Sequence, residues 1–85
     1  MKDPRYAAVK SMLETGRITR LKDVFGIIPI TVVHKDTAIH YATLHRRIQN
    51  PRLLTLDNFI AIAKLIDVKT EVIVSLALAD LPKNK

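Results

Sequence analysis

Three histidines and a pair of adjacent arginines lie close together in the middle of this sequence: His34, His40, His45, Arg46 and Arg47. Imidazole and guanidinium groups suit two kinds of chemistry, metal binding and the recognition of phosphates or base edges. A helical metal site needs histidines three or four residues apart, whereas these are six and five residues apart. His40 and His45 would also point about 140° apart around a helix. We therefore expect no metal site and interpret the segment as a surface for a polyanion.

The remaining residues do not form the pattern of an enzyme. The acidic residues of the C-terminal half are spread over capping and solvent positions, and two glycines are too few for a glycine-rich phosphate loop. Ser11 and Ser75 lie in apolar runs with no histidine at a telling spacing. The chain has no cysteine, which excludes disulfides and cysteine-based zinc sites. The sequence predicts neither an enzyme nor a cofactor.

Positive charge is concentrated in the N-terminal two-thirds of the chain. The net charge is +6, of which residues 1–33 carry +3, residues 34–52 carry +3 and residues 53–85 carry none. A polyanionic partner such as nucleic acid would meet the first two segments. A basic surface also serves solubility alone, so charge by itself leaves both readings open.

Length and hydropathy predict one small domain that spans residues 1–85. Hydrophobic residues make up 48% of the 85 residues, enough for a single modest core. No apolar run approaches the roughly 20 residues that cross a bilayer, and the N-terminus is too polar for a signal peptide. We therefore expect a cytoplasmic protein with no membrane partner.

Capping residues, prolines and glycines divide the chain into helices that would position the basic segment. The expected helices are Pro4 to about Thr15, Arg20 to Phe25, Val32 to Thr37, Tyr41 to Ile48, Leu56 to Ile66 and Thr70 to about Leu81. The expected N-caps are Asp3, Thr19, Thr31 and Thr55, and the expected helix ends are Gly16 and Gly26.

The last of these elements carries conflicting signals. Val72, Ile73 and Val74 favour a strand, whereas the alanines and leucine that follow favour a helix. A lone strand would have no partner, so a helix is expected. Such a helix is apolar nearly all round, which predicts a homodimer contact through the C-terminal helix; full burial within the monomer is the alternative.

Residues 31–48, TVVHKDTAIHYATLHRRI, followed by Gln49-Asn50-Pro51 and Thr55-Leu56, resemble a known family. The resemblance is to the phage repressor and Cro type of helix-turn-helix domain, as found in small bacterial or prophage transcription factors, and it covers about residues 18–80. It implies an all-α, five-helix, lambda-repressor-like fold with the motif at about residues 30–48. In such a unit the first helix braces the second, and the second enters the major groove of DNA.

The resemblance assigns inward positions to four apolar residues. Val33 would face inward from the first helix, Ile39 would plug the turn, and Leu44 and Ile48 would pin the second helix to the core.

Three positions depart from the family pattern. His34 stands where the family has a small residue, Thr37 where it has leucine, and Ala38 where it has glycine. Alanine in a left-handed turn costs about 1 kcal/mol. These departures are compatible with altered helix packing or with a different use of the fold.

The resemblance also implies which residues would contact DNA. The base contacts would be Tyr41, Ala42, His45 and Arg46, and the backbone contacts would be Thr31, His40, Thr43, Arg47, Asn50 and Arg52. The fork of the Arg46 guanidinium fits O6 and N7 of guanine, and the Tyr41 ring or Ala42 would touch a thymine methyl.

We therefore expect a small transcriptional regulator that binds double-stranded DNA in a sequence-specific way, as a homodimer associated with the nucleoid. The alternative function is a protein-interaction module on the same fold, such as an antitoxin subunit that grips a protein partner. The two functions would differ in how partner binding responds to salt, since binding to DNA phosphates weakens steeply as the salt concentration rises.

Overall fold

The computed structural model describes residues 3–81, and all regular structure among them is helical. The elements are α1 (Pro4–Glu14), α2 (Leu21–Ile27), α3 (Ile30–Thr37), α4 (Tyr41–Gln49), the 3-10 turn η1 (Pro51–Leu53), α5 (Leu56–Ile66) and α6 (Thr70–Asp80). The all-α prediction is confirmed, including a helix and not a strand at the C-terminal end. The number of five helices is wrong, since the described part of the chain has six α-helices. Five of them fall within residues 18–80, and α1 precedes that segment.

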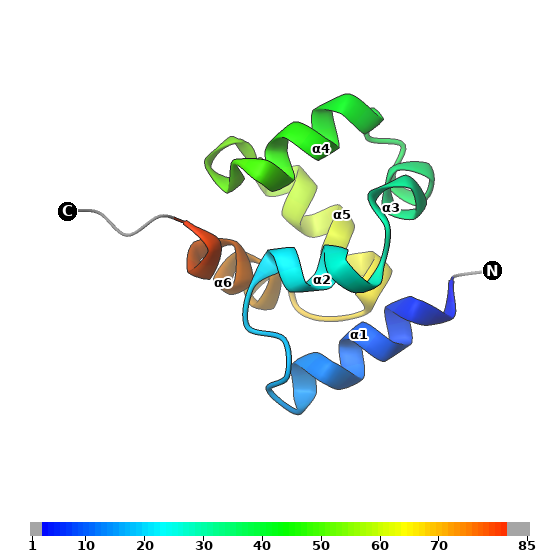
Figure 1. Ribbon diagram of the computed structural model, residues 1–85, viewed down its shortest axis with the longest axis vertical. Coiled ribbons are helices and arrows are strands. Elements are labelled where there is room, and N and C mark those ends of the chain that lie inside the picture. Colours follow the sequence, from blue (N-terminus) through cyan, green and yellow to red (C-terminus); the bar gives the residue numbers. More distant parts are fainter. Residues whose placement is uncertain (1–2, 82–85) are drawn as a thin grey trace.

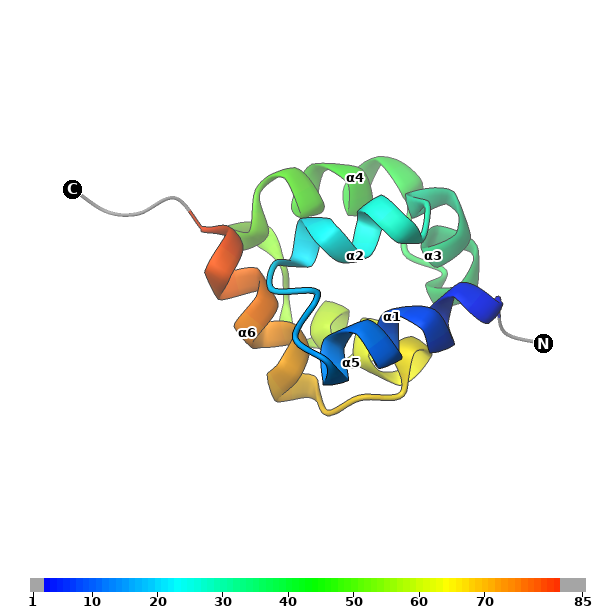
Figure 2. The same ribbon diagram turned by 60° about the horizontal axis from the view of Figure 1, so that its bottom comes forward.

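Helix α5 is the central packing element. It contacts α1, α3 and α6, while α2 contacts α1 and α6, and α3 contacts α4. Figures 1 and 2 show α4 along one side of the molecule, with α1 on the opposite side. The outer surface of α4 is therefore not covered by another helix.

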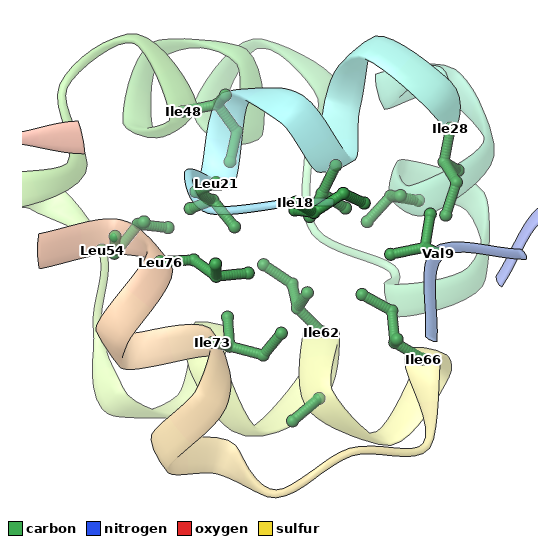
Figure 3. Packing of buried hydrophobic residues seen from close by; sticks show 14 of the residues in the cluster. Val9, Ile18, Leu21, Ile28, Ile48, Leu54, Ile62, Ile66, Ile73 and Leu76 are labelled. Carbon is green, nitrogen blue, oxygen red and sulfur yellow. The ribbon is translucent and has the colours of Figure 1, made fainter. Parts of the chain in front are cut away.

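A single hydrophobic core joins all six helices. Figure 3 shows buried side chains from different helices directed toward a common interior, among them Val9, Leu21, Ile48, Ile62 and Ile73. Each of these five is at most 3% exposed. Burying one aliphatic side chain of this size contributes about 1.5–3 kcal/mol, so this core is the main source of stability.

The predicted ends of α1 are confirmed. The Asp3 carboxylate accepts a hydrogen bond from the backbone N–H of Arg5 at 2.9 Å, and Pro4 takes the first helical position. Beyond the helix, Gly16 adopts the left-handed φ of 75° that a side chain would resist.

The predicted start of α2 is wrong by one residue. Arg20, and not Thr19, is the N-cap, and the helix begins at Leu21. The Asp23 carboxylate accepts hydrogen bonds from the backbone N–H groups of Arg20 at 3.3 Å and Thr19 at 3.4 Å. Asp80, at the end of α6, accepts a further one from the Lys22 N–H at 2.7 Å. The Asp23 carboxylate thus binds the two N–H groups that precede α2, and Asp80 binds the N–H of its second residue, where a threonine cap would otherwise act.

Pro29 sets the boundary between α2 and α3, and two predictions fail there. Gly26 lies within α2, and the helix ends only at Ile27. The C-cap Ile28 has an extended backbone (φ −107°, ψ 117°), the geometry that a following proline imposes. Pro29 and not Thr31 is the N-cap of α3, because its carbonyl accepts the N–H of Val32 at 3.0 Å. Thr31 is therefore an exposed residue inside the first turn of α3.

Helix α1 is tied to α3 by the only aromatic residue it contains. The Tyr6 ring is buried, and its hydroxyl donates a hydrogen bond to Oδ2 of Asp36 at 2.7 Å. Burial raises the pKa of the Tyr6 hydroxyl above its ordinary value, and the hydrogen bond to the Asp36 carboxylate raises that pKa further. Tyr6 therefore stays neutral in the folded chain where a free tyrosine would ionise.

We expect Tyr6→Phe to lower the free energy of unfolding by about 1 kcal/mol at neutral pH, because one hydrogen bond is lost while the ring stays buried. The ordinary tyrosine pKa is 10.0, and that of folded Tyr6 is higher. The stabilisation by neutral Tyr6 is thus complete below about pH 10 and is lost as the pH rises above it. Urea unfolding at steps between about pH 8 and pH 11 should show the difference between wild type and variant shrinking. A difference that stays constant over this range would contradict the assignment.

Candidate nucleic-acid interface

Helices α3 and α4 are joined by a turn of three residues, Ala38-Ile39-His40, as predicted. Ala38 is left-handed, with φ 60° and ψ 16°, and its N–H donates to the His34 carbonyl at 3.0 Å. A residue with a Cβ pays about 1 kcal/mol for this geometry, so the turn is made at a cost that glycine would avoid.

Side chains of α3 hold this turn in place. The Thr37 hydroxyl donates to the Val33 carbonyl at 2.7 Å and accepts from the Ile39 N–H at 3.3 Å. His34 Nδ1 lies 2.6 Å from the Ile39 carbonyl oxygen, which can only accept, so Nδ1 carries the proton. Both backbone polar groups of Ile39 are therefore bound by α3 side chains. We call His34, Thr37 and Ile39 the turn clamp.

The residues expected to face inward do so. Val33 is 2% exposed, Leu44 0% and Ile48 3%, and Ile39 is half-buried against the core. Leu44 and Ile48 lie four residues apart and so fix which face of α4 points into the molecule.

The predicted base-contact residues lie on the exposed surface of α4. Tyr41, Ala42, His45 and Arg46 are all exposed, and we call these four residues the outer face of α4. Their spacing places them on one helical surface, with the Tyr41 side of the face next to the turn clamp.

An aromatic cluster that the sequence did not reveal lies across the start of this face. The rings of Tyr41 and His45 stack, with centroids 6.0 Å apart and planes 21° apart. The rings of His34 and Tyr41 form a T-shaped pair, with centroids 5.9 Å apart and planes 86° apart. The four-residue spacing of Tyr41 and His45 was the one available signal for the stack, since such residues are neighbours on a helix.

The predicted backbone-contact residues surround the outer face of α4. Thr31, His40, Asn50 and Arg52 are exposed, and Thr43 is half-buried. His40 is the N-cap of α4 but makes no side-chain capping bond, while Asn50 and Arg52 follow the end of the helix. These residues thus lie in α3, at the start of α4 and beyond its end.

Arg47 differs from the other predicted contacts because it is held by a buried side chain. Its Nη1 donates to Oδ1 of Asn58 at 2.9 Å, and Asn58 is 6% exposed. The same Oδ1 accepts from the Thr55 N–H at 3.0 Å, while the Asn58 N–H donates to the Thr55 hydroxyl at 3.2 Å. Arg47 thus ties α4 to the first turn of α5. Sequence reasoning missed Asn58, although its spacing from Thr55 is that of a capping box.

This side of the molecule carries positive charge. Residues 40–53 contain Arg46, Arg47 and Arg52 but no aspartate or glutamate. In α3, Asp36 accepts the Tyr6 hydroxyl, and the next acidic residue, Asp57, comes in the first turn of α5. The outer face of α4 therefore suits an anionic partner.

The part of the chain that the structure describes contains neither a metal-binding cluster nor a membrane-spanning helix. Residues 3–81 bring together no group of three histidine, cysteine or acidic side chains that would hold a metal ion. No helix among them has both the length and the apolar character needed to cross a membrane. In comparisons with known proteins, no family model, curated protein or solved structure matches the chain.

We expect Ala38→Gly to raise the free energy of unfolding by up to about 1 kcal/mol, because glycine takes the left-handed geometry without Cβ strain. The larger entropy of glycine in the unfolded chain offsets part of this gain. Ala8→Gly, at an exposed position inside α1, is the matched control and should lower the free energy of unfolding by about 1 kcal/mol. Urea denaturation gives the free energy of unfolding of each variant relative to wild type. Equal losses in both variants would show that Ala38 is not strained.

Proposed function

We propose that this chain is a lambda-repressor-like helix-turn-helix domain that binds double-stranded DNA in a sequence-specific way. Helix α3 braces α4, and the outer face of α4 enters the major groove. The observation that carries the proposal is the α3–turn–α4 unit, in which Leu44 and Ile48 are buried while an exposed face without acidic residues lies opposite. The sequence resemblance to small bacterial or prophage regulators gives the same assignment. The biological role would be transcriptional regulation at the nucleoid.

The proposed roles follow from position and chemistry. Arg46 offers the bidentate fork that recognises guanine, and Tyr41, Ala42 and His45 lie beside it for neighbouring base edges. The residues around this face would bind phosphates and sugars: Thr31, His40, Thr43, Asn50 and Arg52. Arg47 contributes mainly by bracing α4, because Asn58 already engages its guanidinium.

An alternative function as a protein-interaction module, such as an antitoxin subunit, is favoured by one observation. An apolar groove of about 190 Å³ lies between η1, α5 and α6. Its lining includes Leu54, Phe59, Val74 and Ala77, with Leu78 exposed at 62%. Leu53 in η1 and Leu56, the first residue of α5, are also exposed, at 43% and 66%. An apolar groove with an exposed leucine on its lining is typical of a surface that another protein covers.

We propose that a second copy of this chain covers the groove. A two-fold dimer places each patch against the same patch of its copy, and an apolar groove beside the exposed Leu78 offers both a recess and a projecting apolar side chain for such a contact. The expected dimer contact through the C-terminal helix would thus also involve η1 and α5.

The first test is the binding of the full chain to duplex DNA, followed by fluorescence anisotropy over a range of salt concentrations. A DNA-binding domain loses affinity log-linearly with salt, with a slope of about −0.9 for each phosphate contacted.

Arg46→Ala should cost about 1–3 kcal/mol of binding free energy on the preferred sequence and flatten sequence preference. Arg52→Ala should weaken binding to all sequences alike and reduce the slope by about one. Loss of preference in Arg52→Ala but not in Arg46→Ala would refute the assigned roles, and no binding at low salt would favour the protein-interaction alternative.

The dimer proposal predicts that the chain sediments as a concentration-dependent dimer in analytical ultracentrifugation. Leu78→Glu should dissociate it, because a carboxylate in an apolar interface loses hydration without gaining a partner. Ala8→Glu, on exposed α1 away from the groove, is the control and should leave the dimer intact. If the wild-type chain stays monomeric at all concentrations, the dimer proposal is wrong, and the groove would be a site for a different protein.

A further inference from the structure

His34 contacts both the turn and the first residue of α4. Its Nδ1–H donates to the Ile39 carbonyl at 2.6 Å, and its ring makes a T-shaped contact with the Tyr41 ring, with centroids 5.9 Å apart. The two contacts lie on either side of His40, the N-cap of α4. A single side chain of α3 therefore fixes the position of the chain just before α4 and the ring of the first α4 residue.

Tyr41 is held on two sides. The edge-to-face contact with His34 and the stack on His45 both have centroid separations within the favourable range for aromatic pairs. Tyr41 is nevertheless 42% exposed, so a large part of it remains available to a partner. An exposed tyrosine without such neighbours would exchange between rotamers, whereas this one is confined before any partner arrives.

Confinement of an exposed ring lowers the entropic cost of binding. Ordering a side chain at an interface costs conformational entropy, and a side chain that is already ordered avoids much of that cost. The advantage depends on direction, since a ring fixed in one orientation fits one arrangement of base edges better than others. The His34–Tyr41–His45 cluster therefore has the properties of a specificity element and not of a general anion site.

We propose that His34 is a positioning residue that holds Tyr41 for contact with a thymine methyl group in the major groove. The proposal rests on the proposed DNA-binding function and assigns a base to Tyr41, beside the guanine proposed for Arg46. The thymine C5-methyl is the apolar group of the major groove and the natural partner of an aromatic ring. We assign His34 no contact with DNA, since it acts through its hydrogen bond to the turn and its ring contact with Tyr41.

Two substitutions separate the two contacts of His34. His34→Asn keeps an amide N–H near the position of Nδ1, so the hydrogen bond to the Ile39 carbonyl keeps its donor, but the ring that contacts Tyr41 is removed. His34→Phe keeps a ring and removes the donor. NMR signals of the Tyr41 ring in the free protein report its confinement. We expect these signals to move toward those of a free tyrosine in His34→Asn and to stay closer to wild type in His34→Phe, while stability is lowered more in His34→Phe.

The DNA readout uses a duplex selected by the wild-type chain, in which each thymine is replaced in turn by deoxyuridine, which lacks only the C5-methyl. At one position the wild type should lose about fourfold in affinity, the effect expected for one buried methyl group. His34→Asn and Tyr41→Ala should show no loss at that position. The salt dependence should be the same for all three proteins, since no phosphate contact changes.

Each outcome decides the proposal. A wild type that is indifferent to every deoxyuridine, or a His34→Asn variant that discriminates as well as wild type, would overturn the role of His34 but leave DNA binding standing. Failure of the wild type to bind any duplex would overturn the proposed function together with this inference. Unchanged Tyr41 ring signals in His34→Asn would show that His34 does not position the ring at all.

Discussion

The direction of α4 depends on the left-handed backbone of one residue, Ala38. With φ at 60° there, α3 ends and α4 begins within three residues. Alanine is strained in this geometry by about 1 kcal/mol. The hydrogen bonds that His34 and Thr37 make to Ile39 each contribute a similar amount, so the turn clamp offsets the strain. The orientation of every side chain on the outer face of α4 follows from this turn.

The far end of α4 is fixed by a different kind of contact. Thr55 and Asn58 cap α5 reciprocally, and the same Asn58 oxygen receives Arg47 from the last turn of α4. Between the two ends, Leu44 and Ile48 fill the core. Helix α4 is thus attached at its start, along its inner face and at its end. Such attachment leaves the outer face little freedom to reorient, which is what a surface needs to discriminate between similar partners.

Features set by neighbouring residues were predictable from the sequence, and features set by tertiary contacts were not. The bounds of α5 were predicted correctly because Thr55 caps the helix from the adjacent position. The end of α2 is an exception, predicted wrongly although its signals are local, because Gly26 only permits a helix to stop, whereas Pro29 forces the preceding residue out of helical geometry. The exposed face of α4 followed from the four-residue spacing of its two buried residues. The contact between Arg47 and Asn58 did not, because it joins two helices whose relative position no local pattern gives.

The distribution of arginines connects the two proposed surfaces. Arg47 is engaged by Asn58, so Arg46 and Arg52 are the exposed arginines of this segment, and a single copy has few strong phosphate contacts there. Because affinity for DNA grows with each phosphate neutralised, two linked copies bind far more tightly than one. Arg52 belongs to η1, which follows α4 and also lines the apolar groove. If the groove joins two copies, the same short segment fixes both the dimer contact and the position of a phosphate-binding arginine. The distance between the two copies of α4, and hence between the two DNA half-sites, would then be set by the packing of η1 against its partner.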